Sequence, residues 1–256
     1  MTAALSIGIA AAAGPELGAR VAAAAEAAGL HALWVNDTPG HDALEVLGAA
    51  ARATERLVLA TGVLPIDRRT PDDIVSASAG LPADRLVLGI GSGQLRTGAV
   101  GGVTDAATAL RDRTGARVVV GALGPRMRRA GAEASDGLLL SWLTPGVAAE
   151  QAARARGITP ETHVALYVRT AVDPAAVAVL EQETARYAGY PAYAANFARL
   201  DIDAADTVIR PGGELPDRIA AYRDSVDEVV LRAITASGTV DEHLRFIDTV
   251  AEAVAG

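Results

Sequence analysis

The sequence predicts an α/β protein, and specifically a single (β/α)8 barrel. Short apolar runs alternate with longer, Ala-rich amphipathic segments along the chain, which is the order of a parallel sheet whose strands are joined by helices. Eight strand-then-helix units fit into the 256 residues, as such a barrel requires. The strand segments are continuously apolar, which is typical of parallel strands buried on both faces. An open doubly wound sheet shares the alternation, and the number of strands favours the barrel over it.

The eight predicted strands are apolar runs bounded by turn residues. They span residues 5–10, 32–36, 57–63, 85–90, 117–120, 137–141, 163–171 and 226–234. Amphipathic helices are predicted at 15–28, 42–52, 71–80, 105–112, 125–135, 147–155, 174–186, 192–200 and 240–250. The longest irregular stretch, 201–216, lies between the seventh and eighth strands, so we expect a short insertion there that forms a lid or an edge. With no repeat or linker, residues 1–256 are expected to form one domain.

Composition excludes several classes of function. The formal net charge of -8 argues against a nucleic acid or an anionic membrane as partner, because either needs a basic face. The chain has no Cys, which excludes thiol nucleophiles, thiolate metal sites and disulfides. It also has no Lys, which excludes Schiff-base and Walker-type phosphate chemistry.

The apolar start of the chain is interpreted as the first barrel strand. Residues 1–14 lack the positive segment of a signal peptide, and Gly14-Pro15 interrupts the apolar run early. No apolar run is long enough to span a membrane. We therefore expect a cytoplasmic protein.

The segment after the fifth predicted strand is a candidate anion-binding loop. Its residues are Gly121, Ala122, Leu123, Gly124, Pro125 and Arg126. The glycines allow close backbone approach, and Pro125 suits the first position of a helix, whose free N–H groups would face an anion. Arg126, Arg128 and Arg129 crowd this turn although cations are disfavoured at a helix N-terminus, and a bound phosphate would explain them. A solvated basic turn after a glycine bend is the alternative.

Two further loops contribute candidate residues to the same end of the barrel. After the fourth strand come Gly91, Ser92, Gly93 and Gln94, for which a tight turn is the alternative interpretation. Together with the loop after the fifth strand, these residues outline one long ligand lying across the barrel mouth.

After the second strand come Asp37, Thr38 and His41. Asp37 suits a ligand ring N–H, but it equally suits the start of the helix near Asp42. The four His residues are scattered without metal-ligand spacing, so no metal site is predicted. Arg232, near the end of the eighth strand, points either into the mouth or outward. We expect Trp142 to wall the pocket.

Several motifs resemble the bacterial-luciferase-like superfamily, which includes the deazaflavin (coenzyme F420)-dependent oxidoreductases. They are LVLGIGSG at 86–93, ALGPRM at 122–127 with AG at 130–131 and ASDG at 134–137, and AGL at 28–30 running into LWV at 33–35. The resemblance extends over residues 5–235. It implies a (β/α)8 barrel with the cofactor phosphate at the helix that follows the fifth strand.

The resemblance also implies roles for individual residues. A non-prolyl cis peptide that backs the cofactor ring maps to Gly62-Val63, and the family's aspartate behind the second strand maps to Asp37. Bacterial luciferase carries a phosphate-binding Arg in the glycine motif where this chain has Ser92, which favours F420 over FMN. Sugar-phosphate-oxidising relatives carry a His and a Glu where this chain has Thr38 and Gln94, which puts a proton-transferring role in doubt.

These observations predict an oxidoreductase that transfers hydride between F420 and a small organic substrate. The alternatives are an FMN-dependent monooxygenase using the same site and a non-catalytic flavin- or deazaflavin-binding protein. The candidates for catalysis are Asp37, Thr38, His41 and Gln94. An isomerase-like barrel acting on phosphate substrates would need a Glu or His pair at the rim, and this sequence offers no obvious one. Homodimers are common in the family, so a homodimer is a further expectation.

Overall fold

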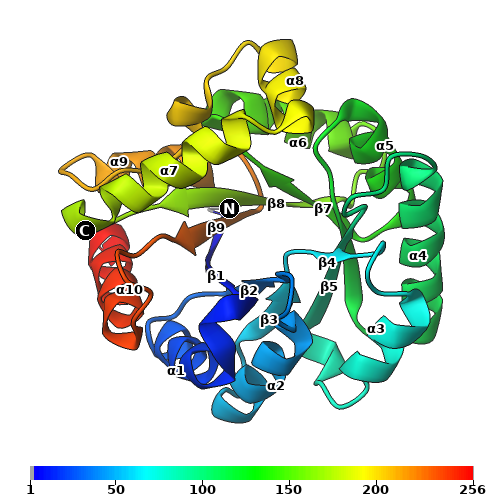
Figure 1. Ribbon diagram of the computed structural model, residues 1–256, viewed down its shortest axis with the longest axis horizontal. Helices are drawn as coiled ribbons and strands as arrows, with labels where there is room; N and C mark the ends of the chain where they lie inside the picture. The colour runs from blue at the N-terminus through cyan, green and yellow to red at the C-terminus, as the bar shows by residue number, and fades with distance from the viewer. Residues whose placement is uncertain (1–2, 256) are drawn as a thin grey trace.

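A computed structural model describes residues 3–255 and shows a closed ring of parallel strands surrounded by helices (Figure 1). The ring consists of β1 (Ala4–Ala10), β2 (Ala32–Asn36), β3 (Val58–Thr61), β5 (Leu86–Gly91), β6 (Arg117–Gly121), β7 (Gly137–Ser141), β8 (His163–Thr170) and β9 (Glu228–Ala233). It closes because β1 pairs with both β2 and β9, while β3 pairs directly with β5. The short β4 (Leu64–Pro65) extends β3 along the end of β5. The predicted (β/α)8 barrel is confirmed.

Helices cover the outside of the ring. They are α1 (Gly14–Ala27), α2 (Ala43–Ala53), α3 (Pro71–Ser78), α4 (Ala99–Arg113), α5 (Pro125–Ala134), α6 (Pro145–Arg156), α7 (Val177–Ala188), α8 (Pro191–Leu200), α9 (Leu215–Arg223) and α10 (Val240–Ala255). Helix α4 begins at Ala99 rather than at residue 105, because Gly98 adopts a left-handed conformation that starts the helix (φ 67°). This first turn was not predicted, because it contains the glycines at 101 and 102 and Gly has a low helix propensity. Of the described helices, none is long and apolar enough to cross a membrane.

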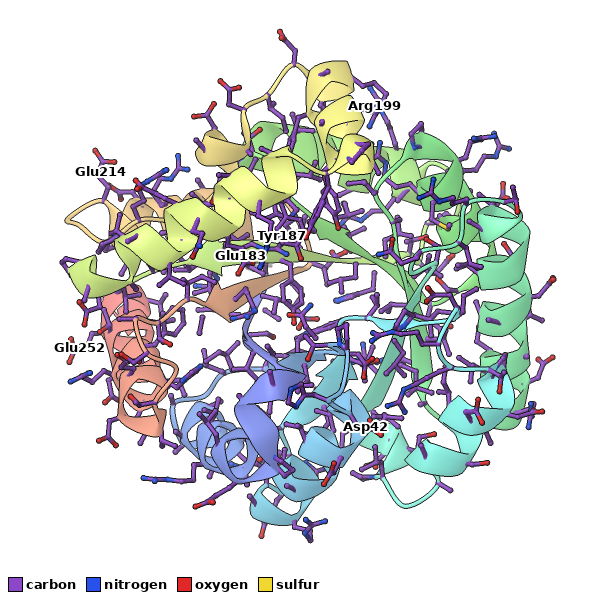
Figure 2. The ribbon with its side chains drawn as sticks, viewed as in Figure 1. Asp42, Glu183, Tyr187, Arg199, Glu214 and Glu252 are labelled. Carbon is purple, nitrogen blue, oxygen red and sulfur yellow. The ribbon has the colours of Figure 1, made fainter. Side chains whose placement is uncertain are left out.

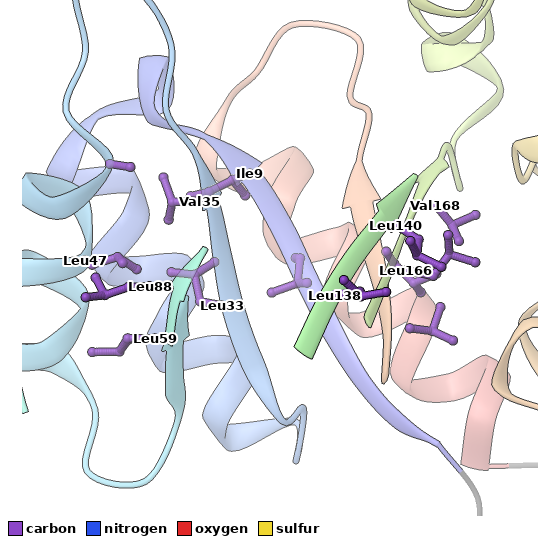
Figure 3. Close-up of a cluster of buried hydrophobic side chains, with 14 of the residues drawn as sticks. Ile9, Leu33, Val35, Leu47, Leu59, Leu88, Leu138, Leu140, Leu166 and Val168 are labelled. Atoms are coloured by element: carbon purple, nitrogen blue, oxygen red, sulfur yellow. The ribbon is translucent and has the colours of Figure 1, made fainter. Parts of the chain in front are cut away.

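Along each strand, successive side chains point alternately outward to the helices and into the inside of the barrel. On β8, Leu166 and Val168 belong to the large cluster between strands and helices (Figure 3). Tyr167, between them, joins the smaller cluster inside the ring, which includes Trp34 and Val230. This alternation also directs Arg169, the next inward position of β8, into the open end of the barrel.

The segment between β8 and β9 contains the two helices predicted there, α7 and α8, and the stretch that was expected to be irregular adds a 3-10 turn at Ala204–Thr207 and the start of α9. Helix α7 crosses over the β8–β9 side of the barrel (Figure 1). Helix α9 was not predicted, because in the sequence Pro216 marks the end of the irregular stretch 201–216, whereas in the fold it occupies the first turn of the helix. Phe197 of α8 and Leu180 of α7 pack on Trp142, which follows β7.

Candidate active site

One cavity of about 770 Å³ opens at the carboxyl ends of the strands. This is the end at which (β/α)8 enzymes carry their active sites. All residues predicted to contact a cofactor line it: Asp37, Gly62, Val63, Gly91, Ser92, Gly93, Gly121, Ala122, Leu123, Gly124, Pro125 and Arg126. Helices α7 and α8 close its far side with aromatic and polar side chains, among them Tyr187, Tyr193, Asn196 and Arg199. The structure thus gathers four separate loops around one ligand-sized space.

The start of α5 is an uncapped helix N-terminus at the edge of this cavity. Gly124 occupies the N-cap position with φ -95° and ψ 163°, no side chain caps the helix, and no acidic residue lies in its first turn. The backbone N–H groups of Arg126 and Met127 therefore have no partner within the helix. A Cβ at Gly124 would have no heavy atom within 4 Å, so the approach to these N–H groups is open.

Three guanidinium groups add positive charge around the same turn. Arg126 and Arg199 line the cavity. Arg128 is buried; its Nη1 donates to the Leu123 carbonyl at 2.8 Å, and its Nη2 has no hydrogen-bond partner among the described residues. Burial, with smaller contributions from Arg199 and Arg154, lowers the pKa of Arg128 to about 10, so it remains charged at neutral pH. A dipole and an unneutralised cation together favour an anion here.

The peptide bond between Gly62 and Val63 is cis, as the family resemblance implied. The Val63 side chain lies between two of the predicted ligand-binding glycines. A Cβ at Gly91 would lie 2.7 Å from Val63 Cγ2, and one at Gly121 would lie 2.9 Å from Val63 Cγ1. These glycines therefore make room for Val63, whereas the sequence suggested that they make room for a ligand. Asn36 Nδ2 donates to the Gly62 carbonyl and holds this segment against β2.

Asp37 is engaged by neighbouring protein groups. Its Oδ1 accepts the Ala43 N–H at 3.1 Å, at the start of α2, and its Oδ2 accepts from Arg68 Nη2 at 2.9 Å. Arg69 Nη2 lies 3.7 Å from Oδ1, and Asp42 is the N-cap of α2. The structural role that the sequence left open is thus the one seen, although Asp37 also touches the cavity.

The other three candidates for catalysis lie away from the central cavity. Thr38 and His41 bridge to each other in a tight turn and line a separate pocket of about 410 Å³ beside α1 and α2. Gln94 is exposed, and its backbone N–H donates to Asp67 Oδ2 at 2.8 Å. Gly93 has a left-handed φ of 57°, and a Cβ there would lie 1.8 Å from Asp67 Oδ1, so the backbone conformation and the contact with Asp67 both favour glycine. In the described part of the chain, no group of three His, Asp or Glu residues could hold a metal ion.

Two residues of β8 that no sequence motif indicated, Tyr167 and Arg169, lie in the cavity. The Tyr167 ring fits between Gly8 and Gly62, where a Cβ at either glycine would be 2.9 Å from the ring. Its hydroxyl has no hydrogen-bond partner among residues 3–255, and burial raises its pKa. Arg169 is buried two residues later on the same inward face. Polar residues at i and i+2 near the carboxyl end of a barrel strand were the signal that could have revealed them.

Arg169 is held firmly in place. Its Nε donates to Glu183 Oε1 at 3.2 Å and its Nη1 to Ser141 Oγ at 2.7 Å. Its Cζ lies 4.3 Å from the centre of the Trp142 ring and 5.0 Å from that of Tyr187, distances typical of cation–π contacts. Glu183 and Tyr187 lie on the underside of α7, toward the barrel mouth (Figure 2). Trp142 is fully buried and backs Arg169, so the expectation that it walls the pocket is wrong.

Comparison with known proteins agrees with this fold. The family model described as luciferase-like monooxygenase matches residues 6–112, and comparison with curated proteins gives no significant match. An F420-dependent secondary alcohol dehydrogenase, solved with an F420–acetone adduct, superposes with a TM-score of 0.72 at 16% identity, covering 99% of both chains.

Two further solved structures are similar at comparable distance. The coenzyme F420-dependent tetrahydromethanopterin reductase of Methanopyrus kandleri has a TM-score of 0.70 and 17% identity, covering 100% of this chain and 99% of its own. The oxygenating constituent of 3,6-diketocamphane monooxygenase from Pseudomonas putida, solved with FMN, has a TM-score of 0.67 and 13% identity over 98% of both chains. Such identities establish the fold, and the neighbours include both F420 and FMN proteins. The family model confirms the predicted resemblance to the luciferase-like family over residues 6–112, and the structural neighbours confirm the fold over the whole barrel.

Proposed function

We propose that this protein is an F420-dependent oxidoreductase that transfers hydride between the deazaflavin and a small organic substrate. The observation that carries the proposal is the uncapped start of α5, with the unpaired Arg128 behind it, on the same cavity as the Gly62-Val63 segment. A phosphate bound there would accept hydrogen bonds from the backbone N–H groups of Arg126 and Met127, and the positive charge of the arginines would attract it. The residues present therefore fit the phosphate of a flavin or a deazaflavin.

The choice of F420 over FMN rests on Ser92. It lies at the cavity edge and leaves the strand-end glycine motif without the phosphate-binding Arg that the luciferases carry there. The cofactor supplies the hydride chemistry when bound. The protein's part is to position the ring against Val63 and Gly62 and to exclude water with Tyr187 and Tyr193 of the insertion.

The FMN-dependent monooxygenase is the second candidate, and the FMN-bound structural neighbour favours it. A non-catalytic binding protein is the third, since Thr38, His41 and Gln94 do not line the central cavity.

The Tyr167 hydroxyl is the group best placed to donate a hydrogen bond to a bound ligand, because it is buried on the cavity without a partner. Its raised pKa keeps it protonated, so it acts as a donor and not as a base.

Titration of the purified protein with F420 and, separately, with FMN tests the proposal. We expect saturable changes in cofactor absorbance and fluorescence with F420. FMN should bind at least about tenfold more weakly than F420, a difference of about 1.4 kcal/mol in binding free energy. Turnover of reduced or oxidised F420 across alcohols and carbonyl compounds, without oxygen consumption, would then support hydride transfer. Absence of binding for both cofactors would contradict the proposal. Tighter binding of FMN with oxygen consumption would favour the monooxygenase, and binding without turnover would favour the non-catalytic protein.

Replacing Tyr167 with Phe tests its hydroxyl as a ligand contact. We expect the affinity for F420 to fall about fivefold, since a single neutral hydrogen bond contributes about 1 kcal/mol. The melting temperature should stay unchanged or rise slightly, because the ring keeps its place between Gly8 and Gly62 and the lost hydroxyl has no partner. Cofactor titration and thermal unfolding measure the two effects. A lower melting temperature with unchanged affinity would show that the hydroxyl serves the fold.

A further inference from the structure

Two arginines lie side by side at the open end of the barrel. Arg169 of β8 and Arg232 of β9 are register partners in the parallel pair of strands. Tyr167 and Val230, two residues before each of them, belong to the cluster inside the ring, so the alternation of the strands directs both guanidinium groups inward. Arg169 lines the central cavity, whereas Arg232 is not among the residues that line it and lies beside Arg169 on the neighbouring strand β9.

The charges around this pair do not balance. Glu183 is the carboxylate that pairs with Arg169, at 3.2 Å, and it also lies 3.8 Å from the exposed Arg186. Arg232 donates to the carbonyl of Ala233, but among residues 3–255 no carboxylate lies within 4.0 Å of it. Burial lowers the pKa of Arg232 although the charge of Glu183 opposes this. Two guanidinium groups and one carboxylate leave one positive charge in surplus, and an unpaired charge that is partly buried, as Arg232 is, destabilises the folded state.

The hydrogen-bonding capacity of the pair is also incomplete. A guanidinium has five N–H donors, of which Arg169 uses Nε for Glu183 and Nη1 for Ser141. Its Cζ lies against both the Trp142 and the Tyr187 ring, which also contact each other, and this packing restricts the position of the group. Its Nη2 makes no hydrogen bond to another group among residues 3–255. A planar, oriented guanidinium matches the two oxygens of a carboxylate.

We propose that Arg169 and Arg232 form a subsite for a singly charged carboxylate on the substrate. The surplus of one charge matches a monoanion, and the shape of the guanidinium favours a carboxylate. The start of α5 adjoins β6, whereas this subsite adjoins β8 and β9, so a cofactor phosphate and a substrate carboxylate would occupy separate sides of the mouth. That the carboxylate belongs to a substrate rests on the proposed function. That the two arginines bind a carboxylate does not depend on it.

Benzoate, with benzamide as its uncharged counterpart, probes the subsite in the protein with and without F420. Trp142 reports on binding, because its ring stacks on Arg169 at 4.3 Å. We expect benzoate to give a saturable change in tryptophan fluorescence and to raise the melting temperature in both forms of the protein, and benzamide to give neither effect at the same concentrations. Benzoate that binds no better than benzamide would overturn the proposal. Competition between benzoate and F420 would also overturn it, because the subsite would then belong to the cofactor.

The variant Arg232→Met separates a binding role from a structural one. We expect its affinity for benzoate to fall at least about tenfold, as when one partner of a buried charge pair is removed. We also expect its melting temperature without ligand to rise by about 2–4 °C, since the substitution removes an unpaired charge. Arg232→Lys should retain part of the affinity, and Arg113→Met, which removes a guanidinium that pairs with the exposed Asp72, should change neither property. A lower melting temperature for Arg232→Met, or full affinity in that variant, would overturn the proposal.

If neither F420 nor FMN binds, the proposed function fails, and the benzoate titration of the cofactor-free protein still decides the subsite. If F420 binds and benzoate does not, the proposed function stands and the carboxylate subsite fails. The two proposals are therefore distinguished by separate measurements on the same protein.

Discussion

Replacing Gly124 with Asp is expected to stabilise the fold and to abolish tight cofactor binding. Gly124 occupies the N-cap of α5 with backbone angles that any residue adopts, and a Cβ there has no heavy atom within 4 Å. Relative to Gly, an Asp at an N-cap stabilises a helix by about a few tenths of a kcal/mol. The new carboxylate would accept the N–H groups that we assign to the phosphate and would repel its charge. We expect the Kd for F420 to rise at least about 100-fold, equivalent to about 2.7 kcal/mol.

The matched control is Gly124→Ala, which adds the Cβ without the carboxylate. It should retain F420 affinity within about threefold, because the added methyl group meets open space. Thermal unfolding and cofactor titration of both variants give the complete result. If Gly124→Asp gains stability and binds F420 as tightly as the wild type, the phosphate does not lie at α5 and the proposed binding mode is wrong.

The fold could be predicted because its signals are local. Each barrel strand is a short apolar run, and β2, β5, β6 and β7 end in Asn, Gly or Ser. Most helices begin close to where a Pro or a polar cap marks them. The errors lie where such signals were ambiguous. Gly98 begins α4 and Pro216 lies in the first turn of α9, but in a sequence both residue types also indicate loops.

The candidate site was predicted in outline and missed in its polar contacts. The loops after β5 and β6 were found because their glycines and Pro125 are conspicuous. The partners of those glycines could not be found, since Val63 and Asp67 come from a distant segment and meet them only in the folded barrel. Arg169 escaped notice for the same reason. Its environment is built from Ser141, Trp142 and Glu183, which lie on different elements.

The opposite end of the barrel contains a buried polar cluster centred on Glu228, the first residue of β9. Its Oε1 accepts from Ser6 Oγ and Trp34 Nε1, each at 2.6 Å, and its Oε2 lies 3.1 Å from His163 Nε2. Glu228 is 2% exposed. Burial alone would raise its pKa, but the hydrogen bonds from His163, Ser6 and Trp34 outweigh burial and lower the pKa below its ordinary value.

Replacing Glu228 with Ala should lower the free energy of unfolding by about 3 kcal/mol, since it leaves Trp34 Nε1 and Ser6 Oγ buried without an acceptor. This corresponds to a fall in melting temperature of about 6–12 °C. Asp72→Asn is the control: it removes an exposed carboxylate that pairs with Arg113 and should have little effect. Denaturant unfolding of the three proteins at neutral pH measures the differences. Equal stability of Glu228→Ala and the wild type would show that the cluster contributes nothing to the fold.

The same carboxyl group should make stability depend on acidity in a defined direction. Because the pKa of Glu228 is lower in the folded than in the unfolded chain, its ionised form stabilises the fold. That contribution is complete above the unfolded value of about 4.3 and is lost as the pH falls through the lower, folded value. The variant Glu228→Gln keeps the size of the side chain but cannot ionise, so its unfolding free energy should fall less steeply than that of the wild type below about pH 4.3. Urea unfolding at several pH values measures these free energies. If they change in parallel with pH for the two proteins, Glu228 titrates alike in the folded and the unfolded state, and the stability of the barrel does not depend on its charge.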